Sequence, residues 1–151
     1  MAGWTNRGKY LILQSFFRNT GAPTVFYLAL FDSSVAPTAD TNVVSDLGQI
    51  PAGNGYTSGG ISVARNATDF DVLTEDDAND RALIQLKDEV WTASGGNLPG
   101  SGTGARYAGL TDDNATVGSR QVVAFFDLSS NRVVSDTQSL TLQNVEMRLT
   151  E

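Results

Sequence analysis

The sequence of 151 residues contains no histidine and no cysteine. Without these two residue types the chain cannot build a Ser-His-Asp triad, a Cys-His nucleophilic pair, a histidine-ligated zinc site or an iron–sulfur cluster. Disulfide bonds are excluded as well, so the fold depends on packing and assembly. These absences disfavour the commonest enzyme classes, and we expect no cofactor, no metal site and no enzymatic activity.

Basic residues are also few, with ten Lys and Arg against seventeen Asp and Glu and a net charge of −7. This balance has the wrong sign for neutralising phosphates, so we expect no nucleic-acid partner. The longest apolar run, Val25–Phe31, is far shorter than the roughly 20 residues that a membrane span needs. The first ten residues show no signal-peptide pattern, so the sequence predicts a soluble protein made in a cytoplasm, with no membrane partner.

The composition between the short apolar runs is rich in Asp, Asn, Ser, Thr and Gly, which is typical of many strands joined by turns. The length fits one domain, residues 1–151, with an N-terminal arm at 1–8, a helix at 9–17 and a β domain at 24–151. The predicted strands are 24–32, which should be central and buried on both faces, and 61–64, 80–91, 106–111, 121–128, 139–143 and 145–149. The predicted fold is therefore mainly β, a single-domain β-sandwich or β-barrel of about seven strands with one N-terminal α-helix.

The predicted helix, for which Thr5 or Asn6 could serve as the N-cap, carries an apolar stripe at helical spacing, made of Tyr10, Leu13, Phe16 and Phe17. Such a stripe usually packs in a core, so we expect it to face the sheet; the alternative is an exposed partner-binding face. Trp4, in the arm, is interpreted either as a docking residue or as a core anchor, and Trp91 as a core residue.

Three further segments are expected to be loops. Residues 33–60 form a long connection, with one short helical turn within 43–50 and a tight turn at Asn54-Gly55. Residues 94–104, rich in glycine and serine, predict a flexible surface loop. Residues 69–80 hold many carboxylates, but their spacing does not match a calcium-binding loop, so a solvated acidic loop is favoured over a cation site.

Several strings, read together, carry a resemblance to known proteins: NRGKYLILQSFFRN, PTVFYLALF, APTADTN, GNGYTSGG, TEDDANDRALIQLKDEVWTASGG, GARYAGLTDDNATV, FFDLSS and SDTQSLTLQ. Over most of its length the chain resembles a group of small virion structural proteins of tailed bacteriophages. The resemblance implies a head decoration (cement) protein, or alternatively a tail or tail-fibre component with a structural or adsorption role. The group supplies no catalytic motif that could be matched to this sequence.

The decoration hypothesis places the chain on the capsid surface of a virion, after synthesis in the cytoplasm of a bacterial host. Its expected partner is the assembled lattice of the major capsid protein, and the resemblance makes a small homo-oligomer, such as a trimer, the expected state. The expected interface residues are Trp4, Asn6 and Arg7 in the arm, and Asn97, Leu98 and Pro99 in the loop at 95–105. An acid-dependent hydrolase using a pair of carboxylates is the alternative from a different class.

Overall fold

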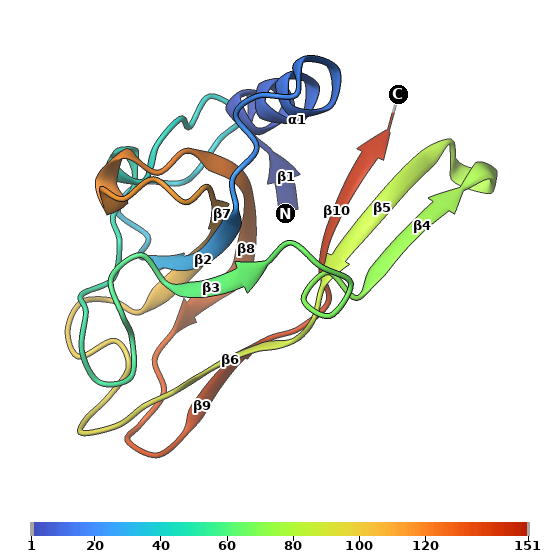
Figure 1. Ribbon diagram of the computed structural model, residues 1–151. Coiled ribbons are helices and arrows are strands. Elements are labelled where there is room, and N and C mark those ends of the chain that lie inside the picture. The colour runs from blue at the N-terminus through green and yellow to red at the C-terminus, as the bar shows by residue number, and fades with distance from the viewer. Residues whose placement is uncertain (1, 151) are drawn as a thin grey trace.

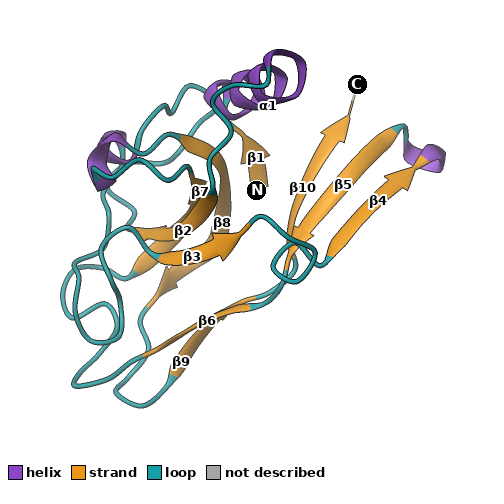
Figure 2. Ribbon diagram, in the orientation of Figure 1, coloured by secondary structure: helices purple, strands orange, loops and turns teal. Residues whose placement is uncertain are grey.

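The computed structural model describes residues 2–150 and shows a mainly β protein with one α-helix in that range (Figures 1 and 2). Its elements are β1 (Ala2–Trp4), α1 (Asn6–Arg18), β2 (Val25–Phe31), η1 (Val44–Asp46), β3 (Ile61–Ala64), β4 (Val72–Asp76), η2 (Asp77–Asn79), β5 (Arg81–Leu86), β6 (Glu89–Thr92), β7 (Ala105–Thr111), η3 (Val117–Ser119), β8 (Val122–Arg132), β9 (Ser139–Leu142) and β10 (Val145–Thr150), where η denotes a 3₁₀ turn. The strands form three antiparallel sheets, with the orders β1-β8-β7-β2-β3, β10-β5-β4 and β6-β9.

This architecture confirms the predicted class, mainly β with one N-terminal helix, and the sheets stay open instead of closing into a barrel. The described residues form ten strands where seven were predicted. Two of the additional strands lie where no strand was expected: β1 in the predicted arm and β4 in the predicted acidic loop. The predicted strand at 80–91 is also divided into β5 and β6 near Lys87, whose backbone N–H donates to the Asp69 carbonyl instead of a neighbouring strand (2.9 Å). The ends of the predicted domain, Met1 and Glu151, lie outside the described residues.

The predicted arm at 1–8 and the predicted helix bounds of 9–17 are wrong. Residues Ala2–Trp4 form β1, which pairs antiparallel with β8 along the edge of the large sheet. The helix α1 starts at Asn6 and continues to Arg18. A three-residue strand carries too little sequence periodicity to be predicted, and here its partner strand supplies the hydrogen bonds that order it.

The core lies around β2, which runs between β7 and β3 in the large sheet. Its last four residues, 28–31, are fully buried, which confirms the prediction of a strand covered on both faces. Trp91 on β6 is 2% exposed and belongs to the same core, also as predicted. The main body therefore gains its stability from the burial of apolar strand residues, at roughly 25 cal/mol for each Å² removed from water.

The long connection from β2 to β3 is held to the core by Tyr56. The tyrosine hydroxyl accepts a hydrogen bond from the Leu30 backbone N–H (3.0 Å), and burial raises its pKa to about 12. Just before it, Asn54 and Gly55 take positive φ values of 50° and 93° in a two-residue turn closed by Gly53 and Tyr56, as predicted for an Asn-Gly pair. The connection is therefore packed rather than loose.

The N-terminal turn of α1 is joined directly to the backbone of β8. The Thr5 side chain caps the helix by accepting from the Gly8 N–H (2.8 Å), and its hydroxyl donates to the Val122 carbonyl. Gly8 faces the Val123 carbonyl so closely that an added Cβ would lie 2.0 Å from that oxygen. Only glycine allows the helix to approach the strand at this point.

We therefore expect Gly8→Ala to lower the free energy of unfolding by about 1 to 3 kcal/mol, the usual cost of overpacking. Helix propensity alone predicts the opposite sign, because alanine is the better helix former by about 1 kcal/mol. Urea unfolding measures the difference. Gly118→Ala is the matched control, since its added Cβ meets only the Ser45 side chain at 3.7 Å. A Gly8→Ala variant as stable as the original chain would contradict this description of the contact.

Candidate functional site

The outer face of α1 is an uncovered apolar surface, which we call the helix stripe: Tyr10, Leu13, Phe16 and Phe17. Their exposed fractions are 47%, 58%, 81% and 75% in that order. The rings of Phe16 and Phe17 touch edge to face, with their centroids 5.0 Å apart. The expectation that this stripe packs in the core is therefore wrong, and the alternative of an exposed face is what the structure shows.

The geometry of the helix explains why the stripe points outward. Gly8 and Leu11 are the buried residues of α1; Gly8 faces β8 at Val123, and the helical period places Leu11 on the same side. At 100° per residue, Tyr10, Leu13 and Phe17 lie on the side opposite to Gly8. Because the contact with β8 uses the small residue of the helix, the bulky side chains are left in water.

The helix stripe lies in a basic part of an acidic protein. The helix contains Arg7, Lys9 and Arg18 and no acidic residue, whereas the whole chain has a net charge of −7. Arg7 donates to the Gln121 side chain and lies over the Tyr10 ring, 4.9 Å from its centroid. Lys9 and Arg18 are exposed and form no ion pair with any residue between 2 and 150. The surface therefore suits a partner with apolar side chains and negative charge.

The three interface residues predicted in the arm lie together beside this surface, but all three have partners within the fold. Trp4 is half-buried, and its Nε1 donates to the Arg148 carbonyl (2.8 Å). Asn6 is exposed, and its side-chain amide donates to Asp40 (2.9 Å). Trp4 is thus engaged in the fold, whereas Asn6 and the half-buried Arg7 belong to the first turn of α1.

The other three predicted residues do not join this surface. Leu98 is fully buried in the core, and its backbone exchanges two hydrogen bonds with Val134, both 2.9 Å. Pro99 is also buried and follows a cis peptide bond, while Asn97 is exposed and its carbonyl accepts from Asn54 (2.8 Å). Most residues of this loop lie at the surface, but the expectation that Leu98 and Pro99 are free to dock is wrong. Figure 1 shows this loop far from α1.

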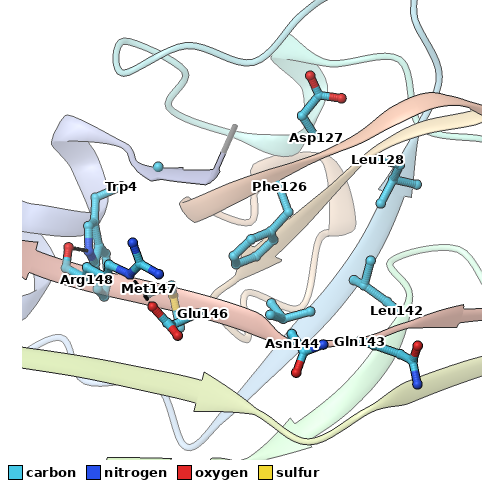
Figure 3. A pocket seen from close by; sticks show the side chains of 12 residues that line it. Trp4, Phe126, Asp127, Leu128, Leu142, Gln143, Asn144, Glu146, Met147 and Arg148 are labelled. Carbon is cyan, nitrogen blue, oxygen red and sulfur yellow. Dashed lines mark hydrogen bonds and ion pairs between the residues drawn. The ribbon is translucent and has the colours of Figure 1, made fainter. Parts of the chain in front are cut away.

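A groove of about 410 Å³ lies between β1 and β8 on one side and β10 on the other (Figure 3). Phe126 and Leu128 contribute apolar lining, and Trp4 lies beside Arg148 at one end of the group. The charged groups are already paired, since Arg148 bonds Glu146 and Asp127 bonds Arg106. Charged groups that already form ion pairs with one another are poor ligands for a substrate.

A second depression, of about 560 Å³, lies at the tip of the hairpin formed by β4 and β5. Glu75, Asp77 and Asp80 contribute carboxylates to it, and Ala82 and Leu149 contribute apolar surface. The acidic segment at 69–80 is thus an ordered hairpin rather than a loop. Among residues 2–150, no group of three or more metal-ligating side chains is placed to hold an ion.

Asp69 and Glu89, whose carboxyl pKa values are shifted in opposite directions, both lie beside Lys87. The Lys87 ammonium donates to Asp69 and, with the Ala64 N–H, holds the pKa of Asp69 below its ordinary value. Burial raises the pKa of Glu89, whose Oε1 lies 3.9 Å from the Lys87 ammonium and has no hydrogen-bond partner. Opposed shifts of this kind occur in acid–base catalysis, but neither of the two depressions described above is lined by these residues.

We expect Glu89→Gln to stabilise the protein at pH 7 by about 1 kcal/mol, because a buried neutral amide costs less than a buried unsatisfied carboxylate. A raised pKa in the folded state means that stability is lost as pH rises above 4.5, the ordinary value for this group. The gain should therefore vanish near pH 3.5, where Glu89 is protonated in both states. Urea unfolding at the two pH values measures it, and an equal gain at both would contradict a charge effect.

No protein-family model, curated protein or solved structure matches the chain. Within residues 2–150, no helix combines the length and the apolar character needed to cross a membrane. The helix stripe is the surface on which a functional interpretation can be built, because it is both exposed and chemically distinct from the rest of the chain.

Proposed function

We propose that the chain is a structural protein of a tailed-phage particle, a decoration protein that binds the outer surface of the assembled major capsid protein lattice and stabilises the head. The observation that supports this proposal best is the helix stripe. Monomeric proteins seldom leave several large hydrophobic side chains together in water, and such patches are typical of protein interfaces. The sequence resemblance described above points in the same direction.

Decoration requires no chemistry from the protein. A protein that binds the assembled lattice and not its free subunits stabilises the lattice by mass action, in proportion to the logarithm of one plus the ratio of its concentration to its dissociation constant. Because the lattice repeats, each bound copy adds a small stabilising free energy, and many copies add a large one. An exposed apolar surface on a stable β body, through which copies can associate on the lattice, suits this role.

The copy number of the chain in purified phage particles tests whether the chain belongs to the head or to the tail. Quantitative mass spectrometry against the major capsid protein should give one copy for every one to few capsid subunits. A handful of copies would instead assign the chain to the tail, where a structural or adsorption role would replace decoration. Complete absence from the particles would overturn both assignments.

Heads that lack the chain provide a functional test. We expect them to release their DNA at a lower temperature than complete heads, and to recover when the purified chain is added back. DNA release during heating, followed with a dye that is excluded from intact heads, measures the difference. The chain should not bind unassembled capsid subunits, since stabilisation by decoration requires preference for the lattice. Equal release temperatures with and without the bound chain would contradict a stabilising role.

A further inference from the structure

The sheet β10-β5-β4 carries an apolar face that continues beyond the core. The register places Leu73, Ile84 and Met147 in one row across the three strands, and Glu75, Ala82 and Leu149 in the next row on the same face. Met147 is buried, whereas Leu73 is 76% exposed and Leu149 46% exposed. The inner face of this sheet is therefore covered at one end and uncovered toward the hairpin tip.

Negative charge surrounds the uncovered end. The hairpin segment from Val72 to Arg81 contains four acidic residues and one basic residue. The basic residue, Arg81, is bonded to Asp76 at 2.7 Å, which leaves Glu75, Asp77 and Asp80 around the depression at the tip. We call this uncovered end, with its apolar floor and acidic rim, the hairpin face.

The helix stripe has the complementary arrangement. Its apolar residues lie along the exposed side of α1. Lys9 precedes them in the same row as Leu13 and Phe16. Arg18 follows them at the C-terminal end of the helix. The hairpin face is apolar in the middle and acidic at the rim, and the helix stripe is apolar in the middle and basic at its two ends. Packing an amphipathic helix on an open sheet face is one of the standard ways to cover both.

We propose that the helix stripe of one copy packs on the hairpin face of a second copy of this chain. Figure 1 shows α1 and the tip of the hairpin formed by β4 and β5 at the same end of the molecule but apart, and in one copy the residues of both surfaces are exposed. A second copy is the partner that the charges favour, since it supplies an acidic rim for the basic helix and a basic helix for its neighbour's acidic rim. This inference rests on the proposed function and assigns the helix stripe to the contact between neighbouring copies, so that the contact with the capsid lattice uses other surfaces of the chain.

The contact joins two different surfaces, so each copy can bind one neighbour through α1 and another through its hairpin. Such head-to-tail contacts form a ring where the rotation between copies closes. Closure would cover both surfaces in every copy without any contact from a foreign protein. The homo-oligomer that the proposed function anticipates would then have a defined interface.

Sedimentation velocity over a concentration series tests the contact with the full chain. We expect the original chain to form a concentration-dependent oligomer, and Phe16→Ser with Phe17→Ser, or Glu75→Lys with Asp77→Lys, to weaken association by about tenfold or more. Matched controls are Val90→Ser with Val133→Ser for the exposed apolar residues and Asp71→Lys with Asp88→Lys for the charges. These controls should associate normally, and urea unfolding should show that all variants remain folded.

Mixing the two defective variants tests the pairing itself. A helix-defective copy keeps an intact hairpin face, and a hairpin-defective copy keeps an intact helix stripe. The mixture should therefore form heterodimers at concentrations where each variant alone associates weakly. Charge reversal gives a second test: Lys9→Glu with Arg18→Glu should weaken association, and combining it with Glu75→Lys and Asp77→Lys should restore it. A helix-to-helix contact would show no recovery in the mixture and would overturn the proposal.

The two proposals can fail separately. A chain that is monomeric at every concentration, or whose oligomer is insensitive to both the helix and the hairpin variants, overturns the contact even if it decorates heads. A chain that assembles as described but is absent from phage particles overturns the decoration function and leaves the contact established.

Discussion

The rest of the molecule's surface chemistry depends on one backbone contact, the approach of the first turn of α1 to β8. Thr5 caps the helix and bonds the strand with the same hydroxyl, and Gly8 lets the helix axis come close to the Val123 carbonyl. Because α1 is held through Gly8, the side chains on the opposite side of the helix face away from β8. The exposed position of Leu13 and Phe17 is thus a consequence of how the helix is anchored.

Charge is distributed as unevenly as apolar surface. In the β body, Arg81, Lys87, Arg106 and Arg148 are each paired with carboxylates of neighbouring residues or strands. Exposed pairs of this kind add little stability, typically below about 1 kcal/mol each. Their effect is instead to neutralise part of the positive charge on the body, so that α1, with three basic residues and no acidic one, stands out as a basic element of an acidic protein. This separation of charge favours the approach of an acidic partner surface toward α1.

The sequence predicted the elements better than it predicted which of their faces are covered. The run at Val25–Phe31 could be recognised because full burial on both faces needs a continuous apolar segment. The helix could be recognised too, but α1 has apolar residues on both sides. The helical period alone cannot show whether the side of Leu11 and Ile12 or the side of Leu13 and Phe17 is the buried one. Gly8 was the available signal, since a glycine inside a helix indicates a close backbone approach on its side.

The errors at the predicted interface have a different cause. Leu98 is a single apolar residue in a Gly/Ser-rich segment, so it forms no periodic pattern, and its burial follows from tertiary pairing with Val134. The strand β4 was not predicted because its acidic residues suggested a loop, although β5 pairs with it along its whole length. In both cases a long-range contact, which composition does not report, overrode the local preference.

The proposed contact also bears on how a protein with uncovered apolar faces avoids indiscriminate association. Copies that each carry a net charge of −7 repel one another in most orientations. The orientation that brings α1 to a neighbour's hairpin replaces this repulsion with attraction and covers the helix stripe and the hairpin face together. Other orientations of two copies leave like charges facing each other or apolar surface in water. The specificity of the contact therefore depends on the disfavoured orientations as well as on the favoured one.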